Sequence, residues 1–255
     1  MAPHLVVQDV TKRFGGVTAL NHLSLEVARE RVTSVIGSNG AGKTTLLNVI
    51  SQLTPPDEGR VLLGAIDLTT LSPARVVRHG IARTFQQLRI FRKLSVLDNV
   101  LLGFQENEGE SLWRLFARPP AVLANRRLNR ARAGAILDTL GLLEVAGTPA
   151  GGLSYGQQKL VSLARVIATD AMLLMLDEPT SGLPPELIAL ILTVVRKLVA
   201  QRKTVLLIEH DMDVVFDVSD RIIVLDEGRL LFEGPPDAVR RNAEVRALYF
   251  GTRVA

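Results

Sequence analysis

A glycine-rich loop with the sequence GSNGAGKT constrains this chain more than any other feature, because loops of this spacing hold phosphate groups. It follows the apolar, strand-like run 32–36 and precedes a helix-like segment. Glycines let successive N–H groups turn toward one anion, and the N-terminus of the following helix adds its dipole. In this pattern Lys43 reaches the β- and γ-phosphates of a nucleotide, and the Thr44 hydroxyl can ligate Mg²⁺. The residues predicted to bind the nucleotide are Gly37, Ser38, Asn39, Gly40, Ala41, Gly42, Lys43, Thr44 and Thr45.

Two acidic residues, Asp177 and Glu178, follow a second apolar run at 172–176. If that run is a strand, both carboxylates lie at the carboxyl edge of the sheet, where α/β proteins bind ligands. Asp177 is then placed for the Mg²⁺ shell, and Glu178 for polarising the water that attacks the γ-phosphate. A strand-terminal pair of acids is by itself more often a solvated turn. Because the chain also has a phosphate-binding loop, a catalytic role for this pair is the preferred interpretation.

Composition and chain length exclude several classes of protein. With 255 residues, of which 47% are hydrophobic, the chain can bury the core of one domain and carry a smaller inserted lobe. Its apolar stretches are much shorter than the ~20 residues that a membrane span requires. Residues 1–4 show no secretory signal, and the sequence has no cysteine for disulfides or thiol chemistry. We therefore expect a cytosolic protein.

The chain is mildly basic, with a net charge of +4 and arginines concentrated between Arg114 and Arg132. Such a segment fits a nucleic-acid surface, an anionic lipid surface or a solvated helix face. Aromatic residues make up only 4% of the chain, which weighs against stacking on single-stranded nucleic acid.

Strand-like and helix-like segments alternate along most of the chain, which predicts a mainly parallel sheet covered by helices on both faces. The runs 5–10 and 23–27 alternate apolar and polar residues and predict half-buried strands of an antiparallel edge. From 94 to about 143 the pattern is helical, with a break at Pro119-Pro120, and it predicts a helical lobe. A final helix is expected to open at Pro235-Pro236-Asp237.

The segment 153–158, LSYGQQ, resembles the signature loop of ATP-binding-cassette (ABC) ATPases, whose usual form is Leu-Ser-Gly-Gly-Gln. Tyr155 departs from that form. The family also has a glutamine after a short strand, matched by Gln86, and a histidine after a later strand, matched by His210. An aromatic residue near its N-terminus stacks on adenine, and Phe14 is the counterpart. The resemblance covers essentially the whole chain.

The resemblance implies an α/β fold of the P-loop NTPase class, with a RecA-like core, an N-terminal antiparallel β-subdomain and an inserted α-helical subdomain. It implies one ABC ATPase domain over 5–251, with the helical insertion at 87–165 and a C-terminal helix and tail at 235–255. ATP and Mg²⁺ are the implied ligands. The implied catalytic residues are Glu178, His210 and Gln86, the implied Mg²⁺ ligands are Thr44, Gln86 and Asp177, and the implied ATP contacts outside the phosphate loop are Phe14, Ser154, Gly156 and Gln157.

The same resemblance implies that one chain cannot complete a site. In the family, the signature loop of one subunit closes over ATP that the phosphate loop of another subunit holds, so that Ser154 and Gly156 donate to the γ-phosphate across a head-to-tail dimer. After Thr180-Ser181-Gly182-Leu183 the family commonly has Asp, and here Pro184 takes its place. That departure affects the loop that normally crosses to the partner.

Five segments resemble more narrowly the ATPases of branched-chain (hydrophobic) amino-acid uptake systems: 82–100, 155–158, the helical lobe with Trp113, 208–212 and 248–251. This implies an importer subunit at the cytoplasmic face of the inner (plasma) membrane, bound there as a peripheral protein. The implied partners are two membrane permeases, a second paralogous ATPase or a second copy of this chain, and indirectly an extracytoplasmic solute-binding protein. No nucleic-acid partner is implied.

Other readings stay open at this point. Systems for urea or short amides and the lipopolysaccharide-export ATPase share much of the pattern. A soluble cassette protein acting on ribosomes or DNA and a non-catalytic ATP switch are the remaining alternatives. Phe14 could be a core aromatic, His210 a helix cap or a residue in a turn, and Gln86 a surface amide. The other three histidines match no motif and are expected at the surface: His4, His22 and His79.

Overall fold

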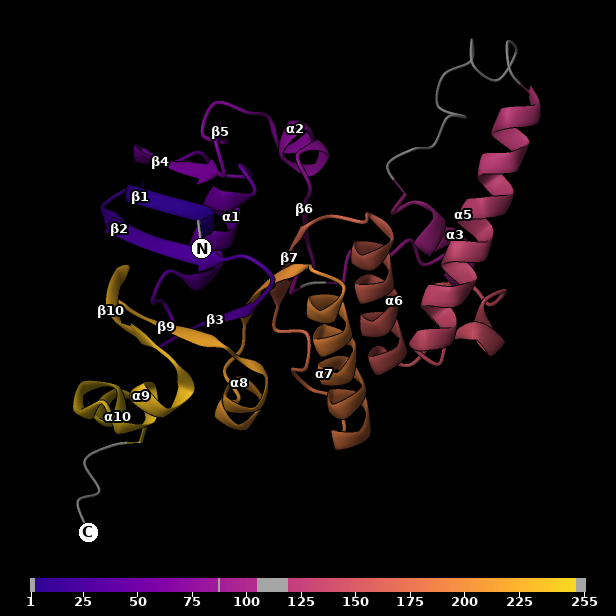
Figure 1. Ribbon diagram of the computed structural model, residues 1–255. Helices are drawn as coiled ribbons and strands as arrows, with labels where there is room; N and C mark the ends of the chain where they lie inside the picture. The colour runs from indigo at the N-terminus through magenta and orange to yellow at the C-terminus, as the bar shows by residue number, and fades with distance from the viewer. Residues whose placement is uncertain (1–2, 87, 105–118, 251–255) are drawn as a thin grey trace. The chain divides into compact units, whose positions relative to one another are not determined.

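The computed structural model describes residues 3–86, 88–104 and 119–250, and its helices and strands are labelled in Figure 1. The chain divides into two compact units. One, which we call the sheet unit, comprises residues 1–83, 172–181 and 191–255, and the other, the helical unit, comprises 84–171 and 182–190. Trp113 and Gly251, which carried part of the family resemblance, lie outside the described residues.

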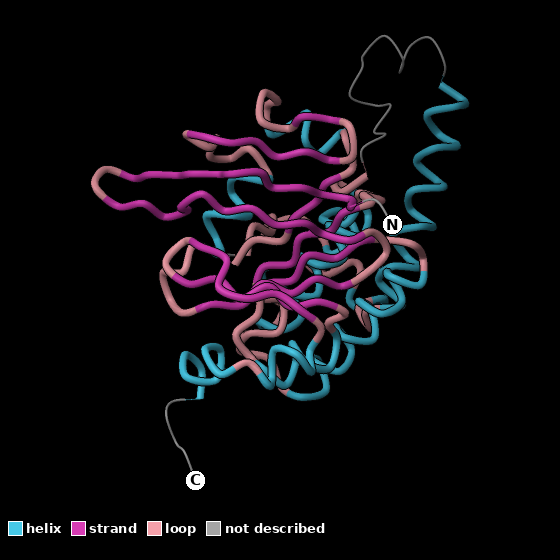
Figure 2. Tube along the Cα trace, turned by 60° about the vertical axis from the view of Figure 1, so that its left-hand side comes forward, coloured by secondary structure: helices cyan, strands magenta, loops and turns pink. Residues whose placement is uncertain are grey.

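The sheet unit is organised around a six-stranded sheet, drawn in magenta with the other strands in Figure 2. Its strands are β3 (Val32–Gly37), β6 (Ile81–Arg83), β7 (Leu173–Asp177), β8 (Thr204–Ile208), β9 (Arg221–Asp226) and β10 (Arg229–Gly234). The order is β10-β9-β3-β8-β7-β6. Neighbouring strands from β9 through β3, β8 and β7 to β6 are parallel, and β10 is antiparallel to β9. Every position of β7 and β8 is buried, as expected where helices cover both faces. The predicted parallel sheet is confirmed.

A second sheet in the same unit has the order β2-β1-β4-β5. Its strands are β1 (Pro3–Phe14), β2 (Val17–Ala28), β4 (Glu58–Leu63) and β5 (Ile66–Asp67), and each pair is antiparallel. Along β2, buried and exposed positions alternate, so that one face packs on the core and the other faces solvent. The antiparallel pairing predicted for 5–10 with 23–27 is therefore confirmed, although the strands are longer than the alternating runs.

One hydrophobic core joins both sheets to helix α1 (Lys43–Ile50). Leu46, Leu47 and Ile50 of this helix are fully buried in the same cluster as residues of both sheets, such as Leu5 of β1 and Met175 of β7. Burying a leucine or isoleucine side chain contributes about 2 kcal/mol, so the helix is fixed from two sides. The loop that precedes α1 is thereby fixed as well.

The remaining helices of the sheet unit follow their capping signals. Ser72 is the N-cap of α2 (Pro73–Arg78), and Asp211 is the N-cap of α8 (Met212–Val218), with its side chain accepting from two backbone N–H groups. The single helix predicted after Pro235 is wrong in one respect, because α9 (Pro236–Arg241) and α10 (Ala243–Phe250) are separate. Asn242 is extended between them, and its side chain accepts from the N–H of Val245.

The helical unit contains α3 (Val96–Leu101), α5 (Pro119–Thr139) and α6 (Tyr155–Ala168), with short 3₁₀ turns at 143–145 and 150–152. Gly103 follows α3 and packs tightly on α6, where a Cβ atom would lie 2.4 Å from the carbonyl oxygen of Arg165. Helix α7 (Pro185–Ala200) begins in this unit and continues into the sheet unit. None of the helices in the described part of the chain is long and apolar enough to cross a bilayer.

Candidate nucleotide site

The glycine-rich loop lies between the carboxyl end of β3 and the start of α1, and its neighbours leave no room for side chains at two positions. A Cβ atom on Gly42 would lie 2.5 Å from the carbonyl oxygen of Ala19, and one on Gly37 would lie 2.5 Å from that of Leu225. Gly42 also has φ +96°, which L-residues rarely adopt. Glycine at these two positions therefore allows the loop to pack directly against the backbone of β2 and β9, and at Gly42 it also allows the positive φ.

The start of α1 leaves its backbone donors without side-chain caps. Gly42 is the N-cap residue, no side chain there accepts a hydrogen bond, and the first turn of the helix has no acidic residue. The first N–H groups of a helix have no partner within it, and together with the helix dipole they favour an anion. The arrangement agrees with the phosphate-binding role predicted for residues 37–45.

Lys43 brings a positive charge to the same loop. Its Nζ atom donates to the carbonyl oxygens of Gly37 at 2.6 Å and Ser38 at 2.9 Å. Burial lowers the pKa of Lys43, while the negative charges of Glu178 and Asp177 raise it. The two acids at the carboxyl end of β7 thus act electrostatically on the ammonium group of the phosphate loop. The sheet unit brings these three predicted site residues together.

Asp177 is the last residue of β7 and belongs to a buried ion pair. Arg83, at the end of β6, donates from Nη2 to Oδ2 of Asp177 at 2.8 Å and from Nη1 to Oδ1 of Asn48 at 2.7 Å. The side chains of Arg83 and Asp177 are 6% and 2% exposed. Removing one partner of a buried pair is costly, because it leaves the other charge uncompensated. Arg83 therefore ties β6 and β7 to helix α1.

The sequence analysis missed Arg83. Its signal was a guanidinium group in the otherwise apolar run that leads to Gln86, but the partner lies 94 residues away in the sequence. Only the pairing of β6 with β7 brings the two together.

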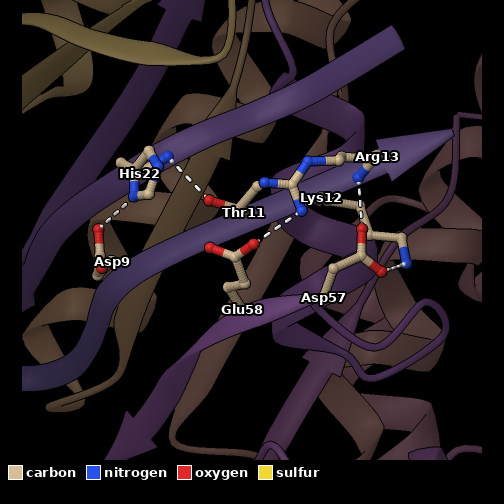
Figure 3. A network of polar contacts seen from close by, with 7 residues as sticks. All are labelled: Asp9, Thr11, Lys12, Arg13, His22, Asp57 and Glu58. Atoms are coloured by element: carbon tan, nitrogen blue, oxygen red, sulfur yellow. Dashed lines mark hydrogen bonds and ion pairs between the residues drawn. The ribbon is translucent and has the colours of Figure 1, made fainter. Parts of the chain in front are cut away.

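Phe14 ends β1 and is 49% exposed, so it is not a core aromatic. The Nζ atom of Lys12 lies 5.6 Å from the centre of its ring. The two residues before Phe14 are braced to the start of β4, because Asp57 accepts from Nζ of Lys12 and from the backbone N–H of Arg13, both at 2.6 Å (Figure 3). Arg13 also donates to Glu58 at 2.8 Å. The network fixes the strand that presents Phe14.

His210 lies just beyond β8, the strand that pairs with β7 in parallel. The register places Asp177 opposite Ile208, two residues before His210. His210 is exposed and is not a helix cap, since Asp211 has that role for α8. Gln86, in contrast, belongs to the helical unit, where it is exposed three residues after β6.

The signature-like loop opens α6 in the helical unit. Ser154 accepts from the N–H of Gln157 at 3.3 Å, and the side chain of Gln157 accepts from the N–H of Ser154 at 3.1 Å, which forms a capping box. A Cβ atom on Gly156 would lie 2.6 Å from a methyl group of Leu187 in α7. Tyr155, the departure from the family pattern, is 52% exposed. The three predicted nucleotide contacts therefore also stabilise the helical unit: Ser154 and Gln157 cap α6, and Gly156 packs against α7.

The prediction that His4 lies at the surface is wrong. Its side chain is buried, and Nδ1 lies 2.8 Å from the hydroxyl oxygen of Thr204, 200 residues away. Burial lowers the pKa of His4, and the charge of Arg29 lowers it further. No sequence pattern around His4 points to Thr204 as its partner. His22, which contacts Asp9, and His79 are both exposed, as expected.

The donors available for a metal are oxygen atoms. In the described residues there is no group of three or more His, Cys, Asp or Glu side chains that could hold a metal ion by themselves. Mg²⁺ in nucleotide sites needs fewer, since one or two protein oxygens suffice when phosphate oxygens complete its shell. The hydroxyl of Thr44 and the carboxylate of Asp177 lie in the same unit and have the chemistry that Mg²⁺ prefers.

Family models match two parts of the chain. A model described as "ABC transporter" matches residues 20–181. A second, described as "Branched-chain amino acid ATP-binding cassette transporter", matches residues 229–255.

Curated proteins resemble the chain over almost its whole length. The high-affinity branched-chain amino acid transport ATP-binding protein LivG of Salmonella typhimurium is 37% identical, and 98% of each chain is covered. BraF of Pseudomonas aeruginosa, described in the same words, is 36% identical with the same coverage. LivG of Escherichia coli (strain K12) is also 36% identical.

Solved structures of similar chains agree with the fold. A nucleotide-free ATP-binding cassette from an ABC transporter superposes with a TM-score of 0.83 at 34% identity, covering 97% of this chain and 99% of its own. The ADP conformation of MJ1267, another such cassette, has the same TM-score and identity, with 98% and 100% covered. The dimeric structure of MJ0796, a bacterial ABC transporter cassette, has a TM-score of 0.77 at 29% identity, with 91% and 98% covered. The predicted fold class is confirmed.

Proposed function

The chain belongs to the ABC-transporter family of ATPases, and from this premise we propose that it energises the uptake of branched-chain amino acids through partner permeases. The family makes it an ATPase. Two observations favour branched-chain amino acids: the family model matched at residues 229–255 and the names of relatives similar over 98% of the chain. The observation that carries hydrolysis is the convergence of Lys43, Asp177 and Glu178 in one unit.

The phosphate loop binds the triphosphate. Backbone N–H groups at the start of α1 face the β- and γ-phosphates, and Lys43 exchanges its bonds to the carbonyl oxygens of Gly37 and Ser38 for phosphate oxygens. The exchange replaces neutral acceptors by charged ones, which form stronger hydrogen bonds. Phe14 offers the exposed face of its ring to adenine.

Glu178 holds the attacking water and accepts its proton as the water oxygen bonds to the γ-phosphorus, while the bond from that phosphorus to the bridging oxygen breaks and ADP leaves. His210, two residues beyond the position paired with Asp177, stabilises charge on the transferred phosphoryl group. The developing charge lies on phosphate oxygens, so that positioning and electrostatic stabilisation supply most of the catalysis.

Thr44 and Asp177 of the sheet unit would hold Mg²⁺. When bound, the ion neutralises charge on the β- and γ-phosphates. Arg83 orients the carboxylate of Asp177 through their buried ion pair.

A second ATPase subunit completes the site. Dimers are known for a related cassette that is 29% identical to this chain. Ser154, Gly156 and Gln157 of one chain contact the ATP held by the other in a head-to-tail dimer, formed with a paralogue or a second copy. Pro184 stands in the loop that precedes α7 and changes what that loop offers the partner. Permeases hold the dimer at the cytoplasmic face of the inner membrane as a peripheral protein.

The proposal is tested by tagging the chain, extracting native membranes in mild detergent and identifying what co-purifies. We expect two permeases and a second, similar ATPase. The purified complex is then placed in vesicles with the solute-binding protein of the same system and assayed for ATP-dependent uptake of labelled leucine. Recovery of ribosomes or nucleic acid instead of permeases would overturn the importer proposal, and uptake of urea or amides but not leucine would overturn the substrate.

A Glu178→Gln variant tests the chemistry separately. It keeps the shape of the side chain but cannot accept a proton. We expect ATP binding to stay within about twofold and turnover to fall by about 1,000-fold, as for loss of a general base. Rapid hydrolysis by this variant would remove Glu178 from that role.

A further inference from the structure

Glu209 is a buried carboxyl group that the proposed chemistry does not use. It follows β8, precedes His210 and is only 1% exposed. Its Oε1 atom accepts two hydrogen bonds from Thr180, one from the backbone N–H at 2.8 Å and one from the hydroxyl at 2.6 Å. Its Oε2 atom is buried and makes no hydrogen bond to any described residue. Both of these hydrogen bonds tie the carboxyl group to Thr180.

Thr180 lies two residues after Glu178, whose backbone is in an unusual conformation. Glu178 has φ +49°, a left-handed value that a residue with a Cβ atom rarely adopts and that costs about 1–3 kcal/mol. Such a conformation persists only where the surroundings enforce it. Pro179 follows directly and has a fixed φ of its own, so that the chain between Glu178 and Thr180 has little freedom.

The segment from Glu178 to Thr180 is attached to the end of β8 at two points. The N–H of Glu178 donates to the carbonyl oxygen of Ile208 at 2.9 Å, which continues the pairing of β7 with β8. Thr180 is attached through the side chain of Glu209, the residue that follows Ile208. The first contact fixes one side of the left-handed residue and the second fixes the other. Without the second, the backbone of Glu178 could relax.

We propose that Glu209 is a positioning residue for hydrolysis: by holding Thr180 it keeps the backbone of Glu178 in the conformation from which its carboxylate reaches the attacking water. The inference rests on the proposed role of Glu178 as the base. It concerns only residues of the sheet unit. A displacement of about 1 Å at a reacting group can lower a rate by about 100-fold, so a contact two residues away can control turnover.

Two opposing influences act on the charge of Glu209. Burial raises its pKa, whereas the hydrogen bonds from Thr180 and the neighbouring His210 lower it. A glutamine at this position keeps the acceptor oxygen and loses the charge. Since the acceptor holds Thr180, Glu209→Gln should retain the arrangement, whereas Glu209→Ala should lose it.

The test compares four variants of the full-length chain in the purified transporter complex: Glu209→Ala, Glu209→Gln, Thr180→Val and Thr180→Ser. We expect Glu209→Ala to lower kcat by about 100-fold with ATP affinity close to that of the unaltered chain, and to lower Tm because both donors of Thr180 lose their acceptor. Glu209→Gln should restore kcat to within about threefold, because the acceptor remains. Thr180→Val should lower kcat by about tenfold and Thr180→Ser should have little effect, since serine keeps both donors.

The Glu178→Gln background separates positioning from general support of the fold. If Glu209 acts through Glu178, adding Glu209→Ala to Glu178→Gln should not reduce the residual rate further. A normal kcat in Glu209→Ala, a further loss in the double variant, or a parallel loss of ATP affinity would each overturn the inference. If Glu178→Gln itself turns over normally, the assignment of the base fails instead, and the two failures are told apart by that variant alone.

Discussion

Two helix starts in this chain are predicted to contact ATP, and they are built differently. At α1 the N-cap is Gly42, with no side-chain cap and no acid in the first turn. At α6, Ser154 and Gln157 form a complete capping box. The first leaves its backbone donors for a ligand, whereas the second already satisfies two of them with its own side chains. The difference fits the proposal that α1 binds ATP within one chain and that α6 contributes after a partner approaches.

The two helix starts also differ in how tightly they are packed, with the loop before α1 more enclosed than the start of α6. The loop before α1 is packed against β2 and β9 so closely that Gly37 and Gly42 cannot carry side chains. At α6 only Gly156 is crowded, by a methyl group of Leu187, while Tyr155 is half exposed. A rigid loop suits a ligand bound at every cycle. An exposed helix start suits a surface that meets another subunit.

The largest effect should come from removing the charge at the first helix start. Lys43→Ala deletes the ammonium group that bonds to the loop and that we propose binds the phosphates. Loss of two charge-assisted bonds should weaken ATP binding by about 100-fold. The measurement is a titration with ATP by calorimetry, with Lys43→Arg as a control that keeps the charge. Unchanged ATP affinity in Lys43→Ala would contradict the assignment of the phosphate loop.

A smaller effect, on the free energy of unfolding, is expected from substituting glycines of that loop. Comparing Gly42→Ala with Gly40→Ala separates close packing from strain in φ. Gly42 and Gly40 both have positive φ, but a Cβ atom on Gly42 would collide with backbone whereas one on Gly40 meets nothing within 4 Å. Gly42→Ala should lower the free energy of unfolding by more than about 2 kcal/mol and Gly40→Ala by about 1 kcal/mol. Urea unfolding measures both. Equal losses would mean that strain in φ, rather than close packing, fixes this loop.

At the second helix start, Ser154→Ala should remove one half of the capping box. The expected loss is about 1 kcal/mol in the free energy of unfolding, measured by urea denaturation. Ser154→Thr, which can cap in the same way, is the control. If alanine has no effect on stability, the capping box contributes nothing, and the contrast with α1 is weaker than proposed.

The smallest effect concerns His4, far in sequence from either helix start. Its pKa is lowered by burial, so the unfolded chain binds a proton more readily than the folded one. The stabilising neutral form is fully present above about pH 6.5, and stability should fall as the pH drops below that value. Urea unfolding at pH 8 and pH 5.5 should show a smaller loss in His4→Gln than in the unaltered chain. The same loss in both would assign the pH dependence to other groups.

Much of this site was predictable because its signals are local. The phosphate loop, the strand before it and the acids at the end of β7 follow from spacing and apolar runs, and the observed strands agree with them. The partners of Asp177 and Thr180 were not predictable in the same way. Arg83 and Glu209 reach them through strand pairing, across 94 and 29 residues of sequence. A buried arginine or glutamate in an apolar run shows that a partner must exist, but not which one.

Asn242 and His4 show a second limit of prediction from the sequence. The predicted C-terminal helix is two helices because Asn242 takes an extended conformation and caps the second one. His4 looked like a surface residue because its partner Thr204 belongs to β8, which is distant in sequence. Such contacts depend on which strand ends lie side by side, and the periodicity of apolar residues does not report that.

The contrast between the two helix starts is tested most directly by the ATP affinity of the purified chain at a concentration where it is monomeric. Titrations of the unaltered chain, Lys43→Ala and Ser154→Ala give the answer together. We predict that Ser154→Ala binds ATP as tightly as the unaltered chain while Lys43→Ala loses about 100-fold. An equal loss in both variants would show that α6 contributes to ATP binding within one chain, which would contradict the account.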